Sequence, residues 1–451
     1  MIIQEKAREI AMNAVLLSLA VLFILSLSRV QLVVAMLAAA VTAGLTAGLS
    51  LTDTIDFFTN GITDNAAIAL SYALLGAYAA GLSETGLPER FVQIAVRLFG
   101  RQQTSQRAHV WSRIGLLLAI AGMASLSQNV IPIHIAFIPV LIPPLLTLFD
   151  RLKLDRRAVA CALTFGLITP YMLIPVGFGS IFHETIARNV AQNGLDFDAA
   201  MLPQAMWIPA LGMLTGLLTA ILFSYRKRRV YREIPAPVAA VEIKKSSPRM
   251  TWTGLLSIAA MLSVQLSTGS MIYGAAAGLG VLLLGRLMPL QRAEHVFTSG
   301  MRQMAYIGFV MMSAAGLAAV LRATGGIESL VQACVGLVGD NRALAAMLML
   351  ALGLLVTLGI GSSFSTIPII ATVFVPLCLE LGFSPLAIAS LIGTAAALGD
   401  AGSPASDSTL GPTSGLAADG QHDHIWDTCV PTFLHYNVPL LIFGFISAMV
   451  L

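Results

Sequence analysis

Residues 399–409 have the sequence GDAGSPASDST, and they interrupt the apolar pattern of the chain. Glycine and proline let a helix unwind, which frees backbone carbonyl and amide groups. Freed carbonyls and hydroxyl oxygens are hard ligands that suit hard cations such as Na⁺. The stretch also carries Asp400 and Asp407, and a charged side chain at the bilayer centre costs at least about 2.5–3.5 kcal/mol. We therefore expect a broken helix at membrane depth that binds a cation.

The rest of the chain has the composition of an integral membrane protein. Of its 451 residues, 57% are hydrophobic and 11% are charged, and the mean hydropathy is +0.83. A soluble domain usually carries about 25% charged residues. The apolar residues form long blocks, such as 11–27 and 31–49, close to the about 20 residues that cross a bilayer as a helix. This pattern predicts an all-α polytopic protein whose partner is the lipid bilayer.

The distribution of positive charge predicts the topology. Residues 225–250 hold eight Lys or Arg against two Glu, so the positive-inside rule places this linker in the cytoplasm. A nucleic-acid-binding patch is the alternative, but a basic loop between two membrane blocks is far commoner. Residues 83–113 and 150–157 are also basic, which puts both flanks of 114–149 on the cytoplasmic side. We therefore expect 114–149 to be a re-entrant hairpin with its tip at Ser127, Gln128 and Asn129.

The chain repeats itself at one constant spacing. Gly61, Thr85-Gly86, Val92-Gln93 and Gly100 recur in the same register as Gly300, Thr324-Gly325, Val331-Gln332 and Gly339. The first repeat is 1–224 and the second is 251–451, each with five transmembrane helices and one re-entrant hairpin. The second hairpin is expected at 344–381, with its tip at 361–366. Five crossings are an odd number, so the two repeats should have inverted topology, with broken helices at the midplane.

The two halves are chemically unequal, which divides the candidate residues into two sets. The first interruption, 169–180, contains no acid, so we expect one strong cation site in the second half. The candidate ion ligands are Asp400, Asp407, Ser403, Ser362, Ser363 and Thr366, and the candidate solute ligands are Ser127, Gln128, Asn129, His134, Thr169, Ser408 and Thr409. His134 is either a proton carrier or a hydrogen-bonded packing residue. The loop 419–427, DGQHDHIWD, is expected to be solvated rather than metal-binding, because a third and a fourth fixed ligand are missing.

These segments resemble a known family. GDAGSPASDST resembles the G-D-x-x-S-P-x-S-D-[ST]-T signature of NhaC-type Na⁺/H⁺ antiporters, and residues 361–366, GSSFST, are similar to that family's G-S-S-x-x-T. Residues 69–88, ALSYALLGAYAAGLSETGLP, resemble a bacterial branch that includes amino-acid permeases, among them histidine permeases. The resemblance covers nearly the whole chain and implies the cytoplasmic (inner) membrane of a bacterium. It implies the ion transporter superfamily, a cation site at Asp400, Ser403, Asp407 and the Ser362-Ser363 tip, and a homodimer formed through a scaffold domain. Ala401 departs from the bulkier or basic residue common in the family.

The sequence thus predicts a secondary active transporter coupled to Na⁺ or H⁺, with no other cofactor, and most simply a Na⁺/H⁺ antiporter that works by alternating access. The closest alternative is Na⁺- or H⁺-coupled uptake of a small amino acid such as histidine. An intramembrane enzyme is a remote alternative. It would need a second mid-helix aspartate or a Ser-His or H-E-x-x-H pair, and the chain has no such motif.

Overall fold

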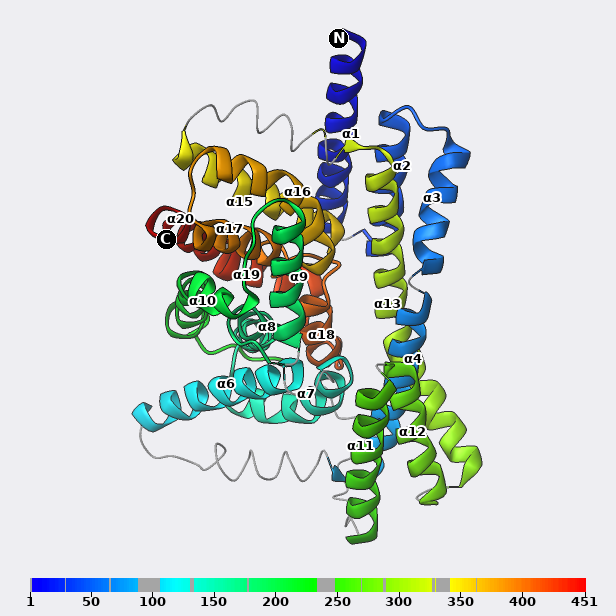
Figure 1. Ribbon diagram of the computed structural model, residues 1–451. Helices are drawn as coiled ribbons and strands as arrows, with labels where there is room; N and C mark the ends of the chain where they lie inside the picture. The colour runs from blue at the N-terminus through cyan, green and yellow to red at the C-terminus, as the bar shows by residue number, and fades with distance from the viewer. Residues whose placement is uncertain are drawn as a thin grey trace.

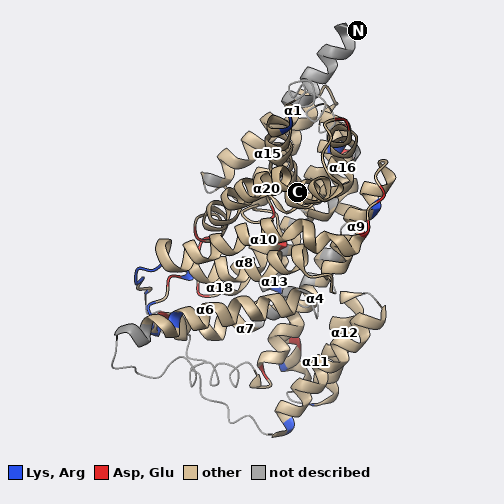
Figure 2. Cartoon of the chain, turned by 60° about the vertical axis from the view of Figure 1, so that its left-hand side comes forward, with Lys and Arg blue, Asp and Glu red and all other residues tan. Residues whose placement is uncertain are grey.

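The computed structural model is built from helices (Figure 1). It describes residues 2–28, 30–64, 66–87, 106–129, 134–176, 178–232, 248–268, 270–286, 289–326, 329, 341–361 and 363–451, and no strand occurs among them. Five of the described segments are long and apolar enough to cross a membrane, namely Val110–Gln128, Ala199–Ser224, Pro248–Thr268, Arg342–Ile360 and His424–Val450. Most of the helical length carries neither basic nor acidic residues (Figure 2). The prediction of an all-α membrane protein is confirmed.

The described helices are divided between the first and the second half of the chain. Those of the first half are α1 (Ile2–Leu27), α2 (Leu32–Thr46), α3 (Leu51–Asp64), α4 (Ala66–Ser83), α6 (Gln106–Asn129), α7 (His134–Arg151), α8 (Arg156–Leu173), α9 (Phe178–Gln192), η1 (Ala199–Met201), α10 (Leu202–Thr219) and η2 (Ala220–Ser224). Those of the second half are α11 (Pro248–Thr268), α12 (Met271–Leu284), α13 (Leu290–Ala323), α15 (Arg342–Ile360), α16 (Ser363–Glu380), α17 (Pro385–Ala397), α18 (Asp407–Leu416), η3 (His424–Cys429), α19 (Val430–Thr432), η4 (Phe433–Asn437) and α20 (Val438–Val450).

Two helices start at equivalent positions of the repeat found in the sequence. Leu32 and Met271 begin α2 and α12, and each helix is capped by the side chain of the preceding residue. Gln31 accepts a hydrogen bond from the backbone N–H of Val34, and Ser270 accepts one from that of Tyr273. Capping satisfies backbone donors that have no partner inside the helix. Both helices therefore begin with a side-chain N-cap.

The packing of α3 and α4 against α13 is reciprocal (Figure 1). A Cβ on Gly61 would lie 2.6 Å from the carbonyl oxygen of Ala315, and a Cβ on Gly300 would lie 2.2 Å from that of Gly76. In the register of the repeat, Gly300 is the equivalent of Gly61, and Ala315 is the equivalent of Gly76. Gly308 in turn packs against Ala69, its own equivalent. The absence of a side chain lets the helices approach closely at both equivalent points.

Each half also contains a helical hairpin and a broken helix. The hairpins are α6–α7 and α15–α16, and the second agrees with the predicted range 344–381. The second arm of each hairpin packs on the broken helix of the other half, because α7 contacts α18 and α16 contacts α9. The hairpin arms are separated in the first half by residues 130–133, which lie outside the described residues.

The first hairpin differs from its prediction in two respects. Its first arm starts at Gln106, in the basic segment that the charge pattern places on the flank, and it spans 24 residues. Glutamine, arginine and alanine are good helix formers, so the helix continues beyond its apolar part. Ser127 and Gln128 are predicted at the tip, but they belong to the last turn of α6.

Candidate cation site

The predicted unwound segment lies between α17 and α18. Helix α17 ends at Ala397 and α18 begins at Asp407, and Gly399 and Gly402 adopt left-handed backbone with φ of 86° and 91°. A Cβ on Gly399 would lie 2.8 Å from the backbone nitrogen of Leu358, so this position needs glycine for space as well as for conformation. The sequence motif therefore predicted the break in the helix correctly.

Asp400 lies in this break and is only 5% exposed. Its Oδ2 accepts a hydrogen bond from the Tyr171 hydroxyl at 2.7 Å and another from Ser408 Oγ at 3.3 Å. Its Oδ1 accepts one from Ser406 Oγ. Among the described residues Asp400 forms no ion pair with Lys or Arg. A buried carboxylate that is held only by neutral hydroxyls needs a proton or a bound cation to offset its lost hydration.

Tyr171 brings the first half of the chain into the site. It lies near the end of α8, and its ring packs against Phe182, with the ring centroids 4.9 Å apart. Its hydroxyl oxygen lies 3.1 Å from Ser363 Oγ, at the start of α16. Because the Tyr171 proton is donated to Asp400, the Ser363 hydroxyl is the donor in this second contact. One chain of hydrogen bonds thus joins the second hairpin, the first broken helix and Asp400.

The sequence-based candidates omitted Tyr171, although it stands within the first interruption, 169–180. A phenol in an otherwise apolar broken helix was the signal that could have found it. Ser406, which was also omitted, lies inside the 399–409 motif itself. Both residues belong to the hydrogen-bonding shell of Asp400.

Asn437 holds the backbone on both sides of Asp400. Its Oδ1 accepts a hydrogen bond from the Gly399 N–H at 2.9 Å, and its Nδ2 donates to the Ala401 carbonyl at 2.6 Å. The side chain is fully buried. An amide within the apolar C-terminal block was the sequence signal for this role, because polar groups in membrane segments find partners. Asn437 was also missing from the sequence-based candidates.

Three of the predicted ligands have hydroxyls that bond elsewhere. Ser403 Oγ donates to the Leu358 carbonyl at 3.3 Å, and Thr409 Oγ1 donates to the Ser403 carbonyl at 2.6 Å. Thr366 Oγ1 accepts a hydrogen bond from Thr357 Oγ1 at 3.1 Å. These contacts tie the unwound segment to the second hairpin and to itself. Ser362, the remaining tip serine, lies outside the described residues.

Asp407 occupies the first turn of α18, where a negative charge is favourable for the helix dipole. The helix is capped by Ser406, whose side chain accepts a hydrogen bond from the Ser408 N–H. Asp407 is half-buried, and its negative charge and that of Asp400 repel each other. Two carboxylates near one another favour the binding of a positive ion between or beside them.

The predicted solute ligands of the first half lie on α6, at the start of α7 and on α8. Ser127 Oγ donates to the Ala124 carbonyl within its own helix. Gln128 Oε1 and Thr169 Oγ1 are buried, and neither has a hydrogen-bond partner among the described residues. A buried polar atom without a partner costs about 1–3 kcal/mol. The side chains of Asn129 and His134 lie outside the described residues.

The loop 419–427 is exposed in part, and its two histidines are held by hydrogen bonds. Asp423 and Trp426 are exposed, as expected for a solvated loop. His422 is buried, and its Nε2 lies 2.7 Å from Thr428 Oγ1. The half-buried His424 pairs with Thr413 Oγ1 at 2.8 Å and with the Pro404 carbonyl at 3.0 Å. Hydroxyl and carbonyl groups of α18, η3 and the unwound segment thus fix both imidazole rings.

An ion pair joins the two halves at the other end of α8. The fully buried guanidinium of Arg156 donates to both carboxylate oxygens of Asp419, each at 2.7 Å, and to Asp150 at 3.1 Å. Burial raises the pKa of Asp419, but the hydrogen bonds from Arg156 outweigh it and hold that pKa below its ordinary value. The pair is thus charged at neutral pH and fixes the start of α8 to the loop that follows α18.

Comparison with known proteins identifies the family of the chain. Residues 162–445 match the model of the Na⁺/H⁺ antiporter family, and residues 13–99 match a second Na⁺-H⁺ antiporter family model. The chain is 53% identical to an uncharacterized membrane protein of Vibrio parahaemolyticus, over 98% of this chain and 100% of that one. It is 50% identical to the putative amino acid transporter YuiF of Bacillus subtilis, again over 98% and 100%. Among solved structures, the YdaH transporter of Alcanivorax borkumensis is 16% identical, with a TM-score of 0.42, over 88% of this chain and 87% of that one. With its unwound 399–409 segment inside the matched region, the chain belongs to the Na⁺/H⁺ antiporter family.

Proposed function

We propose that the protein is a secondary active transporter that exchanges Na⁺ for H⁺ at Asp400. The observation that carries this proposal is the burial of Asp400 among hydroxyl groups, with no basic partner among the described residues. A single carboxylate that binds either a proton or a sodium ion, but not both together, is sufficient to couple the two fluxes. Asp407 would assist by adding negative charge beside the site.

The hydroxyl shell suits both occupants of the site. A hydroxyl group donates one hydrogen bond and accepts others, so Ser406, Ser408 and Tyr171 can turn toward either ligand. When Asp400 is charged, these groups donate to it, as they do here. When Na⁺ is bound, their lone pairs and the carbonyls freed by the unwound backbone can serve as hard ligands. A shell of Arg or Lys would favour only the charged carboxylate.

We further propose that the two halves are inverted repeats and that transport occurs by alternating access. The reciprocal glycine contacts of α3 and α4 with α13 support a two-fold relation, because each partner of one contact recurs in the other. The packing of α7 on α18 and of α16 on α9 supports it as well, because each contact joins a hairpin arm of one half to the broken helix of the other. Inverted repeats that rock about a midplane site are common among secondary transporters. In this scheme the linker 225–250 faces the cytoplasm, and the two hairpins enter from opposite sides as re-entrant elements.

Uptake of a small amino acid, coupled to Na⁺ or H⁺, is the second candidate. It is favoured by Gln128 Oε1 and Thr169 Oγ1, two buried polar atoms that a solute's amino or hydroxyl group could satisfy. The printed name of the Bacillus subtilis relative, a putative amino acid transporter, points in the same direction. The same Asp400 site would then supply the coupling ion.

The purified full-length chain in proteoliposomes separates these candidates. A pulse of external Na⁺ should change the internal pH of vesicles loaded with a pH-sensitive dye if the protein is an antiporter. Labelled histidine and other small amino acids should then not accumulate when a Na⁺ or a proton gradient is imposed. Accumulation of the amino acid without a Na⁺-driven pH change would replace antiport by coupled uptake, and neither response would remove both candidates.

A further inference from the structure

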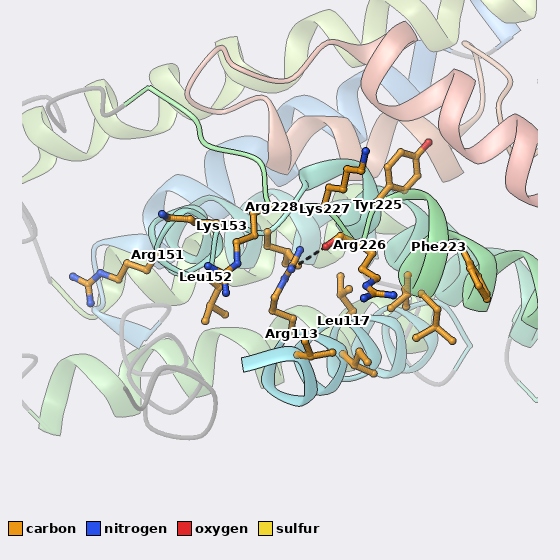
Figure 3. A pocket seen from close by; sticks show the side chains of 15 residues that line it. Arg113, Leu117, Arg151, Leu152, Lys153, Phe223, Tyr225, Arg226, Lys227 and Arg228 are labelled. Carbon is orange, nitrogen blue, oxygen red and sulfur yellow. Dashed lines mark hydrogen bonds between the residues drawn. The ribbon is translucent and has the colours of Figure 1, made fainter. Parts of the chain in front are cut away.

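A large basic cavity lies away from the cation site, where α6, the end of α7 and the end of η2 meet (Figure 3). Its volume is about 660 Å³. One wall consists of the chain segment that follows η2, which opens the linker between the two halves. The cavity therefore lies at the end of the membrane-spanning segment Ala199–Ser224, where hydrocarbon gives way to water.

Among the described residues that line the cavity, the charge is entirely positive. Six of them are basic and none is acidic: Arg113, Arg151, Lys153, Arg226, Lys227 and Arg228. Figure 3 shows these residues on α6, at the end of α7 and in the turn after it, and in the segment after η2. The acids nearest in sequence are already engaged, because Asp150 pairs with Arg156 and Asp155 with Arg157.

Within the described part of the chain, none of these six basic residues forms an ion pair with an acid. Arg113 Nη1 donates to the carbonyl of Arg226 at 3.1 Å, while its buried Nε has no hydrogen-bond partner there. The charges of Arg113 and Arg228 repel each other, and the negative charge of Asp155 opposes this effect on Arg113. A cluster of this kind is stabilised by an anion with several oxygen acceptors, such as a phosphate group.

The remaining wall of the cavity is apolar. Ile114 and Leu117 of α6 face Ile221, Leu222 and Phe223 of η2 across it. Phe223 is 75% exposed, although it belongs to a segment that is apolar enough to span a membrane. A phosphate group gains nothing from contact with an apolar wall, whereas an acyl chain buries its own apolar surface against it. This favours a lipid over a free phosphate or a nucleotide. The combination of a basic pocket and an apolar wall at the cytoplasmic end of membrane helices is typical of sites for anionic lipids.

We propose that this cavity binds an anionic phospholipid, whose phosphate group contacts the basic cluster and whose acyl chains lie along Leu222 and Phe223. The lipid joins α6 and α7 to the segment that follows η2. Farther along that segment, Arg229 pairs with Asp427 at 3.0 Å, and the Tyr231 ring lies under the Arg156 guanidinium at 4.2 Å. A bound lipid therefore holds the start of the linker where it contacts α8.

Native mass spectrometry of the full-length chain in detergent tests this site, with phosphatidylglycerol and phosphatidylcholine as probes. The wild type should bind phosphatidylglycerol in preference to phosphatidylcholine. Arg151→Gln together with Arg228→Gln should weaken phosphatidylglycerol binding about 30-fold, from about 1 kcal/mol for each lost charge. Lys153→Gln together with Lys227→Gln should weaken binding to a similar extent. This second pair tests the site independently in case the first pair of substitutions impairs folding.

The matched control removes two exposed charges outside the cavity, Arg188→Gln with Arg286→Gln, and should leave binding unchanged. Equal binding of the two lipids, or an equal loss in the control, would overturn the proposal. A third arm adds inorganic phosphate at millimolar concentration. Displacement of the lipid by phosphate alone would show a site for free anions, which would also contradict a lipid site.

Discussion

The two broken helices share an architecture but differ in charge. Between α8 and α9 the helix bends by 49° over a short break, and this region supplies the Tyr171 hydroxyl and no carboxylate. Between α17 and α18 the chain runs unwound from residue 398 to 406 and supplies Asp400. The Asp400 carboxylate thus comes from the second half, and part of its hydrogen-bonding shell comes from the first half. Any movement of one half against the other therefore changes the environment of the same carboxylate.

The largest effect on transport is expected from replacing Asp400, which supplies the charge of the site. In Asp400→Asn the amide can neither release a proton nor balance a cation, so coupled transport should fall to the level of empty vesicles. Insertion and thermal unfolding should stay close to wild type, because the amide preserves the shape of the side chain. Sodium-driven pH change in proteoliposomes is the measurement. Asp196→Asn, at an exposed loop position, is the control and should transport normally; full turnover by Asp400→Asn would remove this residue from the mechanism.

The contribution of the first half can be isolated with Tyr171→Phe. The ring and its packing against Phe182 are kept, while the hydrogen bond to Asp400 is lost. Hydrogen bonds to charged groups are worth about 1.5–3 kcal/mol, so the Na⁺ concentration for half-maximal flux should change about tenfold or more.

Tyr436→Phe is the matched control for that measurement. It removes another buried phenol, whose hydroxyl donates to the Cys161 carbonyl instead of Asp400. It should leave the Na⁺ dependence unchanged. An equal change in both variants would mean that the loss of a buried hydroxyl, rather than contact with Asp400, is responsible.

The equivalent glycine contacts of the two halves should contribute equally to stability, although the two halves differ in charge. Gly61→Ala and Gly300→Ala each place a methyl group against a backbone carbonyl, and each should destabilise the protein by about 1–3 kcal/mol. Thermal unfolding in detergent is the measurement. Gly122→Ala and Gly280→Ala, where a Cβ meets no atom within 4 Å, are controls that should not destabilise it. A large effect at only one of the two equivalent glycines would argue against the two-fold relation.

The smallest effect is expected at Gln128 if the protein is an antiporter. Gln128→Leu removes a buried carbonyl oxygen that has no partner in the described structure, so stability should rise by about 1 kcal/mol and Na⁺/H⁺ exchange should persist. Gln192→Leu, on an exposed turn of α9, should change neither quantity. If Gln128→Leu instead abolishes uptake of a labelled amino acid, the first half holds a solute and the second candidate function is favoured.

A good part of this description was accessible from the sequence. The composition determined a membrane protein, and the GDAGSPASDST stretch determined both the break before α18 and the buried acid within it. The spacing between the repeated motifs also relates Leu32 to Met271, the residues at which α2 and α12 begin. The resemblance to NhaC-type antiporters agrees with the family that the comparison found. These features are local, because glycine, proline and a charge in an apolar block constrain the backbone wherever the chain carries them.

Only the tertiary structure decided which groups surround Asp400. Tyr171 comes from the first half of the chain and Asn437 from its C-terminal block, and no spacing rule connects either of them with Asp400. The same holds for His424, because its partners Pro404 and Thr413 lie in neighbouring elements. The physical reason is that the order of residues fixes where each helix breaks, whereas the packing of whole helices decides which side chains a break will meet.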